Sequence, residues 1–229
     1  FIGASFSTYK SEYGTVADPL VDIHMEQERV DLSFGMKEIG WIESLRFKSA
    51  YSDYQHEEIE EGAVGTVFSN EGHESRIELK HKTLGPWEGL FGLQSHFFDF
   101  SAIGDESFLP STKNQSLAGF LFEEAQFGSW KSSFGLRVET SDINAKETFT
   151  DVDPNDIGEA APGGPGVKKS FTGGSASMGT MYLLDDKNSL VLNLAYTERA
   201  PNHQELFANG AHVATEAFER GDLGLNKEK

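Results

Sequence analysis

The feature that most constrains the fold is a two-residue periodicity that returns along almost the whole chain. In residues 45–58, Leu45, Phe47 and Tyr51 lie in one phase, and charged or polar residues fill the other. Successive side chains of a β-strand point to opposite faces, so such a segment predicts a strand with one apolar and one charged face. The same alternation occurs in residues 29–37, 74–82, 130–140 and 189–197. We therefore expect an all-β, antiparallel protein.

The connections between these segments alternate between short and long. Tight turns are expected at 38–43, 84–89, 127–132 and 184–188, and long polar loops at about 13–28, 57–72, 103–115, 145–169 and 201–223. Short ends and long ends would then lie on opposite sides of the sheet. Trp41, Trp87 and Trp130 all fall at tight turns, where an aromatic girdle would meet the headgroup layer. This pattern is typical of a transmembrane β-barrel of the outer membrane. A soluble antiparallel sandwich is the alternative.

The barrel interpretation makes a prediction about the two faces. One set should form a single lipid-facing band: Leu45, Phe47, Tyr51, Ile77, Leu79, Phe134, Leu136, Leu190, Leu192 and Leu194. A second set should line the interior: Arg46, Lys48, Arg76, Glu78, Arg137 and Glu139.

Composition excludes several other classes of protein. The net charge of −18 argues against a nucleic-acid partner and favours the attraction of cations. No apolar run reaches the roughly 18 residues of a membrane-spanning helix, and cysteine is absent, which excludes thiolate metal sites. The sequence has no nucleophile elbow, no phosphate-binding loop and no His-Glu-x-x-His motif, so we do not expect an enzyme or a catalytic cofactor. The chain begins at Phe1 and is expected to be a piece of a longer protein.

Residues 195–228, "AYTERAPNHQELFANGAHVATEAFERGDLGLNKE", resemble the barrel motif of TonB-dependent outer-membrane receptors. The segment 13–32 is similar to the first external loop and returning strand of these receptors, and 51–60, 76–81 and 135–139 are similar to strands of the branch associated with zinc uptake. The resemblance implies a barrel of about 22 strands closed around a plug. Residues 1–229 would supply about nine to ten strands of that barrel domain, without the plug.

The resemblance also implies a location, partners and a task. The protein would lie in the outer membrane of a Gram-negative bacterium, contact its lipid, and couple through the plug to the TonB energy-coupling complex. It would take up a scarce metal, with Zn²⁺ as transported substrate. An iron–siderophore or haem receptor is the alternative, because this sequence lacks the histidine-rich external loop that the zinc branch often carries. A further alternative is a passive binding or structural β-domain without coupling.

Histidines with neighbouring carboxylates are the candidate metal ligands, since neutral imidazole and carboxylate suit zinc. The candidates at the strand rim and in the motif loop are His56, Glu58, His203, Glu205 and His212. His73 and His81 are in the apolar phase, and His96, although in the interior phase, has no nearby acid in phase on its own strand. The alternative is that the acids lie beside histidines by chance and that the loop residues serve loop packing.

Overall fold

The computed structural model describes residues 1–15, 21–104, 107–149, 162–212 and 217–229. Nine long strands form one antiparallel sheet, in which each strand pairs with its neighbours along this order: β1 (Ile2–Gly14), β2 (Val21–Ile39), β3 (Ile42–Glu60), β4 (Ala63–His81), β5 (Trp87–Gly104), β6 (Thr112–Phe127), β7 (Trp130–Ala145), β10 (Val167–Leu183) and β11 (Ser189–Thr197). The prediction of an all-β, antiparallel chain with about nine strands is confirmed.

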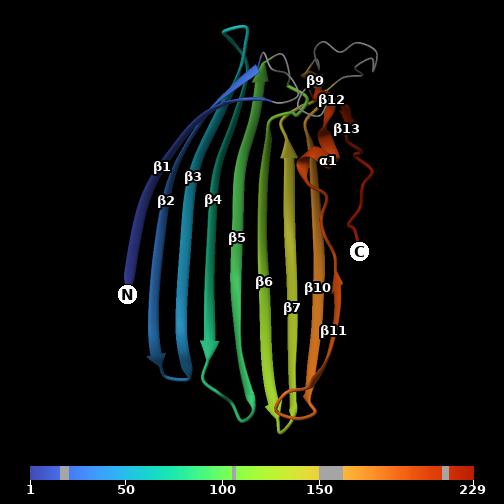
Figure 1. Ribbon diagram of the computed structural model, residues 1–229. Helices are drawn as coiled ribbons and strands as arrows, with labels where there is room; N and C mark the ends of the chain where they lie inside the picture. Colours follow the sequence, from blue (N-terminus) through green and yellow to red (C-terminus); the bar gives the residue numbers. More distant parts are fainter. Residues whose placement is uncertain (16–20, 105–106, 150–161, 213–216) are drawn as a thin grey trace.

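Tight turns join β2 to β3, β4 to β5, β6 to β7 and β10 to β11 at one end of this curved wall, and the long connections lie at the other end together with the short β3–β4 turn (Figure 1). The loop end carries the remaining elements, which are β8 (Thr148–Phe149), β9 (Pro162–Gly164), α1 (His203–Phe207), β12 (Asn209–His212) and β13 (Ala217–Arg220). We call the two ends the turn end and the loop end. In the part of the chain that the structure describes, no helix is long and apolar enough to cross a membrane.

The strand register confirms the predicted division into two faces. Leu45 pairs with Leu79, and Phe134 pairs with Met178, so the apolar phase forms one outer face. Leu136 and Leu194 on this face are 55% and 56% exposed, as a lipid-facing band requires. The residues predicted for the interior share the opposite, lumenal face, on which the register pairs Arg46 with Glu78, Lys48 with Arg76, and Ala118 with Glu139.

Aromatic side chains surround the turn end on the outer face. Trp41 stacks on Phe91 with ring centroids 6.2 Å apart, and Trp130 contacts Tyr182 at 4.6 Å. Trp87 lies between Phe127 and Phe134, at 6.2 and 6.1 Å. Tight turns position these rings, and the β2–β3 and β6–β7 turns contain Gly40 and Gly128 at φ of +59° and +60°, a conformation that favours glycine. The predicted aromatic girdle is therefore present at this end.

The loop end corrects two predictions. The segments 13–28 and 57–72 are not long loops, because β1 to β4 continue through most of them. The turn between β3 and β4 is only Glu61 and Gly62. Here both faces carry polar residues, so the apolar alternation that reveals a strand is lost, while backbone pairing continues.

Two small clusters of buried apolar residues lie at the loop end. In the first, Leu206 and Phe207 of α1 pack against Ile143 and Ala145 of β7. In the second, Ala208 packs with Phe108, Leu109 and Phe100. Because Ile143 and Ala145 share the lumenal phase with Arg137 and Glu139, α1 covers the lumenal side of the wall. The folded-back motif segment thus forms one side of any site at the lumen mouth.

Candidate functional site

The segment after β11 is cross-linked internally by ion pairs and contains a capped helix. Asn202 is the N-cap of α1, and its side chain accepts a hydrogen bond from the Glu205 amide at 2.8 Å. The Glu205 carboxylate accepts one in return from the Asn202 amide, also at 2.8 Å, which completes a capping box. Arg199 donates to both Glu205 oxygens, at 3.0 and 2.7 Å, and to Glu228 at 3.0 Å. Pairing with Arg199 lowers the pKa of Glu205.

A second set of contacts fixes the start of this segment and the end of the chain. Glu198 accepts hydrogen bonds from the Gly174 amide at 3.0 Å and from Lys227 at 2.7 Å. Lys169 of β10 donates to the Leu223 carbonyl at 2.6 Å. Residues 198–212 and 217–228 therefore fold back over the lumenal side of the wall.

His203 projects from the first turn of α1 toward β5. Its ring lies 5.5 Å from the Phe98 ring and 5.1 Å from the Phe100 ring, measured between centroids. His96 contacts the same Phe98 at 5.3 Å. Burial lowers the pKa of His203, so this imidazole is neutral at neutral pH. A neutral imidazole keeps a nitrogen lone pair for a metal or a hydrogen bond.

Two clefts meet at His96 and Phe98 on the lumenal face. The first, of about 270 Å³, lies between the wall and the segment 198–203, and its polar lining includes His96, Arg137, Glu139, Glu198, Arg199 and His203. The second, of about 390 Å³, is lined by residues that include Arg29, Ser52, Tyr54, Asn70, Glu74 and Gly72. Since His96 and Phe98 line both, the clefts form one continuous depression, which we call the lumenal groove.

The lumenal face is also a network of alternating charges. Gln94 accepts hydrogen bonds from Arg76 at 3.1 Å and Arg137 at 3.3 Å, and it donates to Glu74 at 2.7 Å. Arg76 also pairs with Glu78 at 2.7 Å. A wall of this kind presents donors and acceptors of both signs, and it can hold a polar or charged solute without an apolar pocket.

The structure places the five predicted metal ligands as follows. His56 faces the lumen, where its ring stacks on Phe68 at 4.5 Å and its Nδ1 lies 3.0 Å from the Tyr54 hydroxyl. Glu58 is two residues further along the same face. His203 lines the groove, whereas Glu205 is engaged by Arg199 and by its own helix cap. The side chain of His212 lies outside the described residues.

These five residues do not come together as one metal centre in the described part of the chain. No group of three or more His, Cys, Asp or Glu side chains there is placed to hold a metal ion. The role of the five as ligands stays a prediction. The contacts of Glu205 are those of a loop-packing residue.

His96 is the residue that sequence reasoning missed. Its neighbour in space is Glu74, which lies directly opposite it on β4. A search for acids along the strand of His96 cannot find this pair, because the partner comes from across the strand ladder. The tight turn at 84–89 could have indicated this pair, because the length of a hairpin turn fixes which residues of its two strands lie opposite each other.

An antiparallel sheet with an apolar outer face, a charged lumenal face and its long connections all at one end is typical of the wall of a transmembrane β-barrel. Residues 3–229 match the family described as "TonB dependent receptor-like, beta-barrel". The chain belongs to this family, and its nine strands are a partial barrel of the TonB-dependent type.

Solved structures agree with this fold. The chain is similar to the structure titled "Copper transporter OprC" at 14% identity and a TM-score of 0.77, covering 92% of this chain and 36% of that one. It is also similar to the Serratia marcescens hemophore receptor HasR, solved as a double mutant with its hemophore HasA and haem, at 10% identity and a TM-score of 0.74. That match covers 99% of this chain and 38% of HasR. The chain therefore spans less than half of either structure, and at these identities the likeness concerns the fold alone.

Proposed function

We propose that this chain forms part of the wall of an outer-membrane receptor that takes up a scarce metal into a Gram-negative bacterium, with transport coupled to TonB. Membership of the TonB-dependent receptor family supports this proposal. The outer face would contact lipid, and the strongly acidic composition fits a cationic or metal-bearing substrate better than nucleic acid. Catalysis has no part in the proposal.

The observation that carries the proposal is the lumenal groove, with His96 at the junction of its two clefts and His203 in the first cleft. Both side chains contact Phe98, one from the strand wall and one from the folded-back segment. Because burial keeps the pKa of His203 low, its imidazole is available to Zn²⁺ at neutral pH. Zinc is the first candidate substrate, with further ligands supplied from outside the described wall.

A specific observation favours a second candidate, a metal complex such as an iron siderophore or haem. His56, His96 and His203 each lie against a phenylalanine ring. Aromatic rings with nearby arginines offer a surface for a flat, anionic organic ligand, whereas a bare ion gains little from them. The similarity in fold to HasR, whose solved complex contains its hemophore and haem, supports this second candidate.

The test is a double substitution in the full-length receptor, His96→Ala with His203→Ala. We expect uptake of the true substrate at limiting concentration to fall about tenfold or more, with receptor abundance in the outer membrane unchanged. Zinc and iron-complex uptake are measured in parallel, because a loss confined to one identifies the substrate. His24→Ala on the outer face of β2 is the matched control and should have no effect. Unchanged uptake of every metal form would remove the groove from the transport route.

A further inference from the structure

The outer face carries a shallow apolar depression over three neighbouring strands. Its volume is about 580 Å³, and its lining includes Leu136 of β7, Ala176 of β10 and Tyr196 of β11. The register places Ala176 directly between the other two residues. The small side chain of Ala176 therefore forms a floor between two larger side chains on the lipid-facing side.

The depression extends along β10 as a groove between two ridges. On β10 itself, Gly174 follows Ala176 toward the loop end, and in the described part of the chain a Cβ atom at Gly174 would meet no atom within 4 Å beyond its immediate chain neighbours. Toward the turn end, Met178 lies between the ridges and closes the groove. Bulky side chains form the ridges, which are Phe134, Leu136 and Val138 on β7, and Leu194 and Tyr196 on β11.

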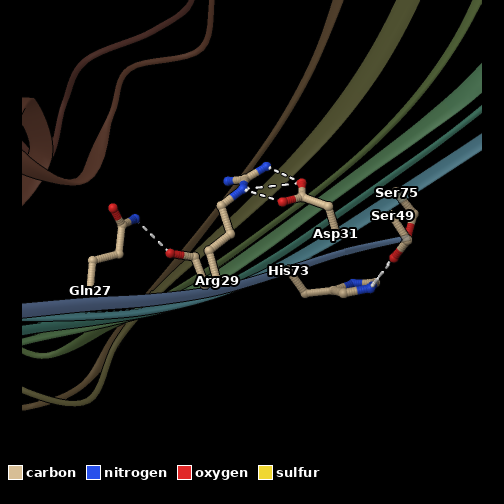
Figure 2. Close-up of polar contacts among 7 residues, drawn as sticks. Gln27, Arg29, Asp31, Ser49, His73 and Ser75 are labelled. Carbon is tan, nitrogen blue, oxygen red and sulfur yellow. Dashed lines mark hydrogen bonds and ion pairs between the residues drawn. The ribbon is translucent and has the colours of Figure 1, made fainter. Parts of the chain in front are cut away.

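Small residues on this face do not by themselves leave a hollow. On β3 and β4, Ser49 pairs with Ser75, and the ring of His73 lies against both hydroxyls (Figure 2). Nε2 of His73 is 3.0 Å from the Ser49 hydroxyl and 3.3 Å from the Ser75 hydroxyl. Ser75 also donates a hydrogen bond to Ser49 at 3.0 Å. A side chain of the protein thus covers the small residues there, whereas the surroundings must fill the space over Ala176.

The groove lies at the depth of the hydrocarbon. Tyr182, which contacts Trp130 in the aromatic girdle of the turn end, shares the strand and the outer face of Ala176. At about 3.3 Å per residue and a tilt near 40°, the six residues between them cover about 15 Å of a band roughly 25 Å tall. The groove is therefore closed near the middle of the bilayer and open toward the leaflet at the loop end.

The size of the groove identifies its occupant. A stable contact between two proteins uses about 20–30 residues on each side, far more than the outward side chains of this groove. The gap between the ridges is one row of missing large side chains, so a single hydrocarbon chain fits its width. The lining offers such a chain dispersion contacts, because the one hydroxyl of the two ridges, on Tyr196, already donates to Glu198 at 3.0 Å.

We propose that the groove over Gly174 and Ala176 binds one saturated acyl chain of an outer-membrane lipid, with the end of the chain against Met178. A saturated chain lies straight between the two ridges, whereas a cis double bond bends the chain out of the groove. The protein recognises the chain and not the headgroup. The site is separate from the lumenal groove, and it depends on the proposed function only in that the sheet lies in a membrane.

The test uses the full-length receptor in micelles of a short-chain detergent, with bound lipid counted by native mass spectrometry. Lysophosphatidylcholine, which has one acyl chain, is titrated in its stearoyl and oleoyl forms. The wild type should bind the saturated form several-fold more tightly. Ala176→Leu places a side chain in the groove and should weaken stearoyl binding about tenfold, because contacts with the floor are lost. Ala4→Leu, beside Leu32 on the outer face of β1, is the matched control and should change nothing.

Stearoyl lysophosphatidylglycerol tests the headgroup and should bind as tightly as the choline lipid. A strong preference for either headgroup would overturn recognition through the chain. Unchanged binding in Ala176→Leu would place the chain elsewhere, and loss of a receptor dimer in this variant would assign the groove to a second copy. If Ala176→Leu does not fold, the wild type decides, since equal binding of stearoyl and oleoyl lipids would refute a straight groove. Metal uptake has no part in these measurements, so their failure and failure of the proposed function are distinguishable.

Discussion

The turn end and the loop end of the wall are built from the same strands but are stabilised differently. At the turn end, apolar and aromatic residues such as Trp87 and Phe134 face outward, and the surrounding lipid provides their favourable environment. At the loop end, the outer face is acidic, and the strands are held by backbone pairing, by ion pairs such as Lys10 with Glu26 at 2.6 Å, and by the packing of α1. The comparison shows that one strand can extend from the lipid-facing band into the water-facing rim without interruption of its backbone hydrogen bonds.

The largest expected effect tests this difference within a single strand. Met178 and Thr172 lie on the outer face of β10, with Met178 nearer the turn end. Met178→Arg should lower the free energy of unfolding in lipid vesicles by about 2–4 kcal/mol, because a cation enters the hydrocarbon band. Thr172→Arg should cost about 1 kcal/mol or less at the interface.

Ser177→Arg provides the control, because this neighbour of Met178 faces the lumen. Denaturant unfolding followed by tryptophan fluorescence measures all three changes. Equal losses for Met178→Arg and Thr172→Arg would show that the band does not end between them.

Sequence periodicity predicted the turn end well for the same physical reason. The alternation of Leu45 and Phe47 with Arg46 and Lys48 exists because lipid and water face the two sides of the strand. The pattern therefore indicates that the segment is a strand, which of its faces meets lipid, and that it lies at the depth of the membrane. At 57–72 that contrast disappears, and the sequence alone suggested a loop where β3 and β4 continue. Strand pairing through backbone groups leaves little trace in side-chain pattern.

The candidate site was predicted only in part, and again the ladder explains why. The lumenal direction of His56 followed from its phase, and His203 lay in a recognisable motif. That Phe98 would bring His96 and His203 to one groove depends on the register of β5 and on how α1 folds back, which are distant contacts. That Glu205 is engaged by Arg199 and Asn202 is a further contact that phase does not report.

The second prediction sharpens the comparison through pH. Burial lowers the pKa of His203 below its ordinary value of about 6.5, so the unfolded or released segment binds the proton more readily than the packed one. The packing of α1 is thus at full strength above pH 6.5 and weakens as pH falls from about 6.5 toward the lowered pKa.

Protease cleavage within 198–229 measures this release. Cleavage should rise a few-fold between pH 7.5 and pH 5.5 in the wild type, and this rise should disappear in His203→Phe, which keeps the ring contacts with Phe98 and Phe100. Because the protease's own activity changes with pH in the same way for both proteins, the difference between wild type and variant isolates the contribution of His203. The same rise in His203→Phe would assign the pH response to other groups.

The smallest expected effect compares the hairpins that close the two ends. Glu38 near the β2–β3 turn and Glu61 in the β3–β4 turn are non-glycine residues with φ of +58° and +48°. A left-handed conformation destabilises the folded state by about 1–2 kcal/mol for a residue with a side chain, and glycine removes this cost. Glycine also has more conformational freedom in the unfolded chain, which lowers the free energy of unfolding by about 0.5–1 kcal/mol. Glu61→Gly should therefore raise the free energy of unfolding by about 0.5–1 kcal/mol. Glu38→Gly should change it less, because the ion pair of Glu38 with Lys82 at 2.9 Å is lost as well. Both are measured by denaturant unfolding in vesicles, and a larger gain at Glu38 than at Glu61 would show that the two hairpins do not carry comparable strain.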